Sequence, residues 1–305
     1  MDKYLGCLLG LACGDALGTT VEFRPPGSFQ PVFDITGGGP FRLQPGQWTD
    51  DTSMALCLAD SLISCDGFDA KDQMERYVRW WKKGYLSSTG SCFDIGNTVR
   101  ESLERFIQSG DPCSGSTSSL SQGNGSLMRL APVPMFFASN IVEAIEMSGQ
   151  SSRTTHGASG CIDACRYFGG LMVGALGGVD KKTLLSERFC PIENYWEQNL
   201  LDPGIDTIAR GSFKNKQPPE IRGTGFVLAS MEAALWAFYT TCTFEEGCVR
   251  AVNLGDDADT TGAIYGQLAG AFYGKSGIPQ HWLERIYRID LIEQFAEKLF
   301  KNSEG

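Results

Sequence analysis

The chain has 305 residues, of which 42% are hydrophobic and 20% charged, and its formal net charge is −10. This composition is typical of a globular protein with a packed core, and it excludes a disordered or fibrous chain. The acidic balance argues against nucleic acid as a general partner, because binding a polyphosphate backbone requires clustered Lys and Arg.

Apolar residues recur at helical spacing in ten segments, and few runs alternate with the period of two typical of strands. The segments are residues 4–17, 50–64, 70–81, 96–108, 141–149, 157–176, 225–239, 244–252, 260–273 and 292–300. No change in composition divides the chain, so the sequence predicts an all-α fold. Residues 109–126 and 202–224, rich in Ser, Gly or Pro, are predicted loops; the first is either a connector or a ligand-binding loop.

Glycines recur every fourth residue in three of these segments. The three glycine ladders are Gly6, Gly10, Gly14 and Gly18; Gly170, Gly174 and Gly178; and Gly262, Gly266, Gly270 and Gly274. Because each glycine costs a helix about 1 kcal/mol relative to alanine, the ladders indicate close helix packing. Membrane helices share this spacing, but Gln267 and the flanking acids argue against a bilayer span. We expect the first and last ladders to bring Glu22 and Asp257 to one site.

The cysteines and the N-terminus indicate a cytoplasmic protein. The eleven cysteines are scattered without a Cys-x-x-Cys pair, which is typical of reduced thiols. His156 and His281 are the only histidines, so a Cys/His zinc site has little support. The N-terminus has neither a basic region nor a cleavage site, and we expect no signal peptide.

Two acidic clusters each precede a predicted helix. In the first, Thr49, Asp50 and Asp51 offer three hard oxygen ligands, although a helix N-cap is the simpler interpretation of that cluster alone. In the second, Asp256, Asp257 and Asp259 stand within four residues beside Thr260. A helix N-cap needs only one of these acids, and the three negative charges repel one another. A bound cation would relieve this repulsion. The two clusters therefore predict opposite sides of a two-metal centre.

Several short motifs occur together in a consistent order along residues 5–282. They are Gly14-Asp15-Ala16-Leu17-Gly18 with Glu22, Gly46-Gln47-Trp48-Thr49-Asp50-Asp51-Thr52, Gly123-Asn124-Gly125-Ser126-Leu127-Met128-Arg129, Thr155-His156 and Gly255-Asp256-Asp257-Ala258-Asp259-Thr260. In this order they resemble the ADP-ribosylglycohydrolase family, above all the dinitrogenase reductase-activating glycohydrolases and the ADP-ribosyl-arginine hydrolases. The resemblance implies one domain over residues 1–305, a compact orthogonal helix bundle with a binuclear metal cleft.

The resemblance also implies the site residues. Two Mg²⁺ or Mn²⁺ ions would be held by Glu22, Thr49, Asp50, Asp51, Asp257, Asp259 and Thr260. Asp94 and Glu22 would transfer protons, Asn97 would line the ribose site, and Asp256 has no assigned role. The remaining substrate wall would comprise Gly123, Asn124, Gly125, Ser126, Met128 and His156. Without the resemblance, the simpler interpretations are that Asp94 is a routine helix cap, that the glycine loop is a common turn and that His156 has a structural role.

The implied reaction is removal of ADP-ribose from a modified acceptor by attack of metal-activated water at ribose C1″. An N-glycosidic ADP-ribosyl-arginine is favoured; ADP-ribosyl-serine, a nucleobase or O-acyl-ADP-ribose are the alternatives. A metal-free two-carboxylate glycosidase, a binuclear phosphoesterase and a non-catalytic ADP-ribose-binding protein remain as competing hypotheses. Two residues near the expected substrate site depart from the family pattern. They are Gly157 and Phe226, and some relatives carry Tyr in place of Phe226. The expected partners are an ADP-ribosylated protein and the product ADP-ribose. Nucleic acid is expected only as a modified substrate, and no membrane partner is expected. The enzyme is expected to be a monomer.

Overall fold

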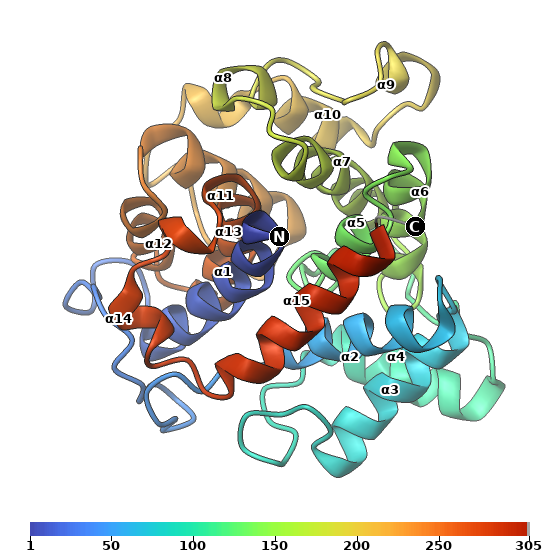
Figure 1. The fold of residues 1–305 in the computed structure, drawn as a ribbon, viewed down its shortest axis with the longest axis horizontal. Helices are drawn as coiled ribbons and strands as arrows, with labels where there is room; N and C mark the ends of the chain where they lie inside the picture. The colour runs from blue at the N-terminus through green and yellow to red at the C-terminus, as the bar shows by residue number, and fades with distance from the viewer. Residues whose placement is uncertain (304–305) are drawn as a thin grey trace.

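The computed structural model describes residues 1–303 and consists of helices joined by turns and loops (Figure 1). Within these residues no β-sheet forms; there are only isolated bridges between single residues. This confirms the predicted all-α fold. The α-helices are α1 (Asp2–Gly18), α2 (Asp50–Cys65), α3 (Ala70–Lys83), α4 (Asn97–Ser109), α5 (Pro132–Phe136), α6 (Ile141–Arg153), α7 (Ser159–Leu176), α8 (Lys181–Leu184), α9 (Tyr195–Gln198), α10 (Pro203–Ala209), α11 (Val227–Thr240), α12 (Phe244–Val252), α13 (Ala258–Tyr273), α14 (Gln280–Leu283) and α15 (Ile289–Ser303). Three 3₁₀-helices, Thr19–Val21, Ser212–Lys214 and Lys275–Gly277, follow α1, α10 and α13.

The first and last glycine ladders pack directly against each other in α1 and α13. A Cβ atom added to a glycine of α1 would lie 2.0–2.4 Å from a carbonyl oxygen of α13, in the pairs Gly6 with Gly270, Gly10 with Gly266 and Gly14 with Gly262. The descending partner numbers show that the two helices are antiparallel. Such an approach leaves no room for any side chain, so glycine is required at these positions. The predicted close packing is confirmed.

The antiparallel pairing determines which segments meet. Glu22 follows the end of α1 and Asp257 precedes α13, so both residues lie at the same end of the helix pair. They line one cleft, as expected, although 235 positions separate them in the sequence. The site therefore lies at this end of the helix pair.

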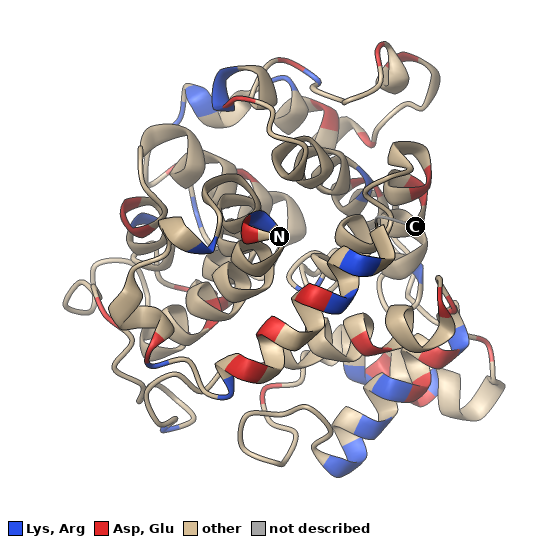
Figure 2. Ribbon diagram, viewed as in Figure 1, with Lys and Arg blue, Asp and Glu red and all other residues tan. Residues whose placement is uncertain are grey.

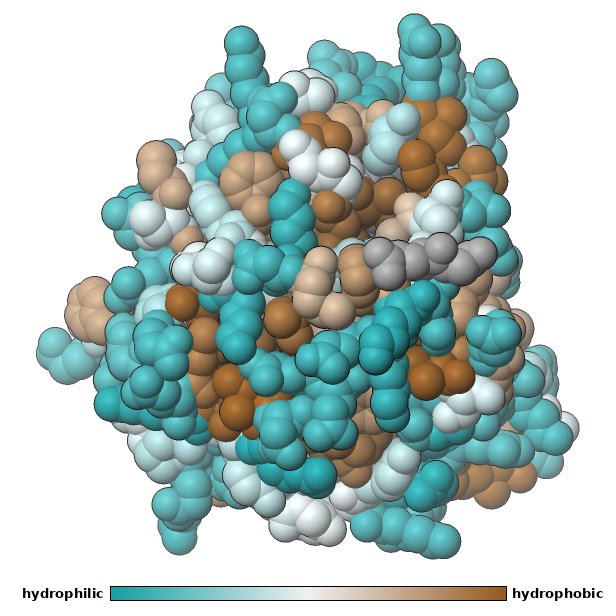
Figure 3. Space-filling model, in the orientation of Figure 1, coloured by the Kyte–Doolittle hydropathy of each residue, from teal (hydrophilic) through white to brown (hydrophobic). Residues whose placement is uncertain are grey.

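Amphipathic helices cover this central pair. In α15 the buried face contains Ile292, Phe295 and Leu299. The helix crosses the front of the molecule in Figure 1, and Figure 2 shows both acidic and basic residues along it. Several Lys and Arg residues lie along α3. On the face shown in Figure 3, hydrophobic side chains occur in separate patches with hydrophilic side chains between them.

Two features differ from the simplest sequence interpretation. Residues 202–224, predicted to be a loop, contain the helix α10 and a 3₁₀-helix. Asp202 caps α10 by accepting a hydrogen bond from the Gly204 backbone, and Pro203 occupies the first helical position, where proline needs no N–H partner. The middle ladder also differs, because Gly174 faces the Phe189 ring and not another backbone.

One stretch, Asp2–Val21, is long and apolar enough to cross a membrane, but 89% of its apolar window is buried inside the protein. Its small residues contact α13, so its apolar character is explained by its place in the core.

Candidate metal centre and substrate cleft

A cleft of about 680 Å³ opens at the end of α1 and α13. Most of the residues that the sequence singles out lie along it. The lining includes Glu22, Asp50, Asp94, Asn97, Gly123, Asn124, Gly125, Met128, His156, Asp257 and Thr260. Thr49, Asp51 and Asp259 lie just beneath this surface and are at most 1% exposed. Ser126 is also behind it, where its hydroxyl accepts a hydrogen bond from Ser152 at 2.9 Å.

The acids do not cap the helices that they precede. Thr49 and Asp257 occupy the N-cap positions of α2 and α13, yet neither side chain accepts a capping hydrogen bond from a backbone N–H of its own helix. The cap of α2 comes instead from Asp15 on α1, which accepts the backbone N–H groups of Thr49 at 2.9 Å and Thr52 at 3.1 Å. Because Asp15 satisfies these donors, neither Asp50 nor Asp51 is needed as the cap; Asp50 lines the cleft and Asp51 lies beneath it.

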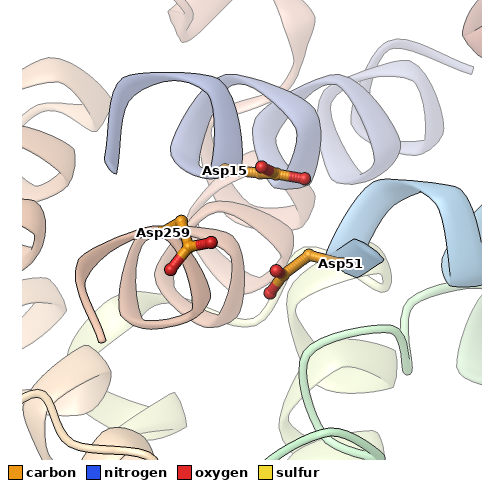
Figure 4. A group of neighbouring side chains, drawn as sticks. All are labelled: Asp15, Asp51 and Asp259. Carbon is orange, nitrogen blue, oxygen red and sulfur yellow. The ribbon is translucent and has the colours of Figure 1, made fainter. Parts of the chain in front are cut away.

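Three carboxylates from three helices converge beneath the cleft. Figure 4 shows Asp15 of α1, Asp51 of α2 and Asp259 of α13 pointing toward one another, and an oxygen atom from each lies within 4.8 Å of the others. The Thr49 hydroxyl is within hydrogen-bond distance of all three, at 3.0, 3.0 and 3.2 Å. It has one hydrogen to donate, so it satisfies only one of these carboxylates, and the other two contacts need a protonated carboxyl or a nearby cation. The group would be stabilised by a cation.

A second acidic group includes Glu22, Asp94 and Asp259, with carboxylate oxygens within 4.8 Å of one another. Burial, with the negative charges of Asp94 and Asp257, raises the pKa of Glu22 to about 10. Burial and the charge of Asp257 raise the pKa of Asp94 to about 7. Asp94 also has a positive φ of 54°, a sparsely populated backbone conformation that is concentrated at functional sites.

The unpaired atoms of this region fit a divalent cation. Buried carboxylate oxygens without a hydrogen-bond partner belong to Glu22, Asp51, Asp256 and Asp259. Burial, followed by the neighbouring carboxylates, raises the pKa of both Asp51 and Asp259 well above the usual range. Carboxylate oxygens are the ligands that Mg²⁺ and Mn²⁺ prefer, and an ion would supply the charge that these orphaned oxygens lack.

The glycine loop is joined directly to the acidic group. Asn124 donates from Nδ2 to Asp257 Oδ2 at 2.7 Å, and its backbone N–H donates to the Gly225 carbonyl. Beneath the loop lies the His156 ring, close enough that a Cβ atom on Gly125 would fall 2.9 Å from it. The loop, the histidine and the acids thus form one continuous wall.

Two structural roles were not apparent from the sequence. Asp15 lies in one of the motifs that carry the family resemblance, and its other signal is its charge within the long apolar part of α1. Asp256 joins the Glu22 turn to α13 through its backbone: its N–H donates to Arg24 and its carbonyl accepts from Phe23. Asp256 and Phe23 both have positive φ angles, of 53° and 61°. Asp256 thereby helps to place Glu22 beside Asp257.

The raised pKa values predict how the metal-free protein responds to pH. The Asp15 pKa is raised from 3.8 to about 6, mainly by burial, and the Asp94 pKa from 3.8 to about 7. Between about pH 4 and pH 7 the folded chain therefore holds protons that the unfolded chain has released, so stability falls as pH rises. Thermal melts with a chelator should show this slope, and saturating Mg²⁺ should flatten it; equal slopes in both series would contradict the cation site.

Comparison with known proteins identifies the fold and motifs. The ADP-ribosylglycohydrolase family model matches residues 1–305. ADP-ribosylarginine hydrolase Tri1 of Serratia proteamaculans (strain 568) is 41% identical over 300 residues, covering 98% of this chain and 79% of the relative. ADP-ribosyl-(dinitrogen reductase) glycohydrolase of Rhodospirillum rubrum is 32% identical over 289 residues, covering 93% and 90%.

Similarity in structure agrees with similarity in sequence. A solved ADP-ribosylglycohydrolase-related protein complex contains a chain that superimposes with a TM-score of 0.87 at 43% identity, covering 99% of this chain and 98% of that one. The matches extend over the acidic clusters and the glycine loop alike. The chain belongs to the ADP-ribosylglycohydrolase family and is a hydrolase of the glycosidase type.

Proposed function

We propose that this protein removes ADP-ribose from ADP-ribosylated arginine in a protein substrate, with residues 1–305 acting as one domain. The observation that carries the proposal is the convergence of buried acids from α1, α2 and α13 beneath a cleft that a glycine loop also lines. The arginine acceptor is supported by the two relatives described above, whose names specify arginine or dinitrogen reductase.

The candidate ligands are the oxygen-bearing residues at the closed end of the cleft: Glu22, Thr49, Asp50, Asp51, Asp257, Asp259 and Thr260. Two Mg²⁺ or Mn²⁺ ions would supply Lewis-acid stabilisation and a hydroxide-like nucleophile at neutral pH. Asp15 belongs behind these ligands, because its two oxygens already accept hydrogen bonds from the backbone and hydroxyl groups of Thr49 and Thr52. It holds the start of α2 in place.

Asp94 is suited to proton transfer. It lines the cleft, and in the metal-free chain burial and the charge of Asp257 raise its pKa to about 7, close to the pH at which a general acid or base is most effective. Asn97, at the start of α4, is exposed in the same wall and offers its amide to the ribose. Backbone N–H groups of the loop at Gly123 and Gly125 supply donors for the diphosphate.

A substrate panel tests the reaction. Purified protein with Mg²⁺ should release intact ADP-ribose from ADP-ribosyl-arginine, and more slowly or not at all from ADP-ribosyl-serine, O-acetyl-ADP-ribose and ADP-ribosylated DNA. Release of AMP or phosphate would instead identify a phosphoesterase, which the same ligands are able to support. Turnover of the serine substrate alone would overturn the arginine assignment.

ADP-ribose binding should depend on the cations much more than on ionic strength. With a net charge of −10 the protein repels a dianion at long range, so the attraction has to come from the bound cations and donors inside the cleft. Calorimetric titration should show a large loss of affinity with a chelator and a modest one with added NaCl, because contacts in a cleft are screened less than surface contacts. Binding that ignores chelators and vanishes with salt would exclude this site.

A further inference from the structure

Arg129 is a buried cation without an acidic partner. Its side chain is completely buried, and within residues 1–303 it forms no ion pair with Asp or Glu. Nη1 donates to the Gly125 carbonyl at 2.6 Å, Nη2 donates to Thr155 Oγ1 at 2.7 Å, and Nε has no partner. Burying an uncompensated charge is costly, and the Tyr77 ring beneath the guanidinium offsets only part of that cost. An anion nearby would compensate the charge.

Thr155 connects this cation to His156. The buried Thr155 hydroxyl accepts from Arg129 and lies 2.8 Å from His156 Nδ1. Among the described residues no other acceptor is within reach of its single hydrogen, so that hydrogen belongs on the bond to Nδ1. The ring then carries its own hydrogen on Nε2. In the opposite tautomer Nδ1 and Arg129 would both donate to one oxygen, and the Thr155 hydrogen would be buried without an acceptor.

The Nε2 atom faces the glycine loop in the cleft. His156 lines the cleft, and Cβ atoms built on Gly123 or Gly125 would each lie 3.3 Å from Nε2. Within residues 1–303 Nε2 has no hydrogen-bond partner of its own, whereas Nδ1 is bonded to Thr155. Burial, followed by the charge of Arg129, lowers the pKa of His156 to about 3, so the ring is neutral under ordinary conditions. A neutral N–H donor with a fixed direction is left facing the substrate space.

We propose that Arg129 and Thr155 are positioning residues that hold His156 as the Nε2–H tautomer, donating to the diphosphate of ADP-ribose. The buried guanidinium also provides a positive charge behind the loop that the phosphates approach, in a protein whose cleft is otherwise acidic. The identity of the ligand rests on the proposed function; the tautomer and its cause rest on the Arg129, Thr155 and His156 contacts alone.

Nuclear magnetic resonance tests the tautomer without any ligand. His156 and His281 are the only histidines, so the variant His281→Gln leaves one imidazole to assign in correlation spectra of the ¹⁵N-labelled, Mg²⁺-loaded protein. We expect a protonated Nε2 and an unprotonated Nδ1 in the full chain. In Thr155→Val, which keeps the shape and removes the hydroxyl, this preference should be lost, and Thr155→Ser should restore it. A protonated Nδ1 in the parent protein would overturn the proposal.

Calorimetric titration with ADP-ribose tests the consequence. Thr155→Val should weaken binding about tenfold, as expected for a misdirected hydrogen bond to a charged group, and Thr155→Ser should bind within about threefold of the parent. Mn²⁺ affinity should stay unchanged in both, since neither variant touches the acids. Equal ADP-ribose affinity in Thr155→Val would contradict the proposal. Intact ADP-ribose binding without hydrolysis of ADP-ribosyl-arginine would contradict only the proposed reaction.

Discussion

Replacing Asp257 with asparagine is expected to abolish both hydrolysis and high-affinity Mn²⁺ binding while leaving the fold intact. Asp257 accepts from Asn124 but makes no cap bond to α13, so the carboxylate charge is not needed to start that helix. An amide keeps the shape of the side chain and removes the negative charge that a divalent cation requires. Calorimetric titration with Mn²⁺ and an assay with ADP-ribosyl-arginine measure the two losses.

Asp69 provides the matched control, because it is an exposed aspartate that does cap its helix. Its carboxylate accepts from the backbone N–H groups of Lys71 and Asp72 at the start of α3. Asp69→Ala should therefore lower the free energy of unfolding by about 1 kcal/mol and leave metal binding unchanged. Asp257→Asn should show the reverse pattern. Undiminished Mn²⁺ binding by Asp257→Asn would remove this residue from the metal centre.

Replacing Gly266 with alanine is expected to destabilise the protein by about 3 kcal/mol or more, although alanine is the better helix former. The new Cβ atom would lie 2.0 Å from the Gly10 carbonyl oxygen, and a backbone atom in a buried helix has little freedom to move away. The α1 and α13 backbones would have to separate. Chemical denaturation measures the change in the free energy of unfolding.

Gly170→Ala is the control for this substitution. Gly170 belongs to a ladder with the same spacing, but its nearest neighbours are the Ile145 side chain at 3.6 Å and the Trp196 ring at 3.8 Å, which are ordinary contacts. Alanine here should be neutral or stabilising by up to about 1 kcal/mol, since it restricts the unfolded chain. If both variants behave alike, close backbone packing is not the reason for the glycines.

The sequence determined the features that depend on local periodicity. Apolar spacing alone located α12 at residues 244–252, as observed, and the ten predicted segments each correspond to a helix in the structure. The short helices α5, α8, α9, α10 and α14 were not predicted, because one or two turns provide too little periodicity. Proline and glycine in residues 202–224 favoured a loop, although proline also begins helices, as it does in α10.

The site residues also separate into those that the local sequence indicated and those that only the packing of the helices decided. The acidic clusters and the glycine loop are short motifs, so the sequence by itself indicated their chemistry and their family. Only the tertiary structure decided that Asp15 of α1 caps α2, that Asp256 joins the Glu22 turn to α13, and that Arg129 reaches His156 through Thr155. Most of these contacts join residues distant in sequence, and all depend on buried geometry. Periodicity describes which face of a helix is apolar; the partner of a buried polar group follows only from how the helices pack.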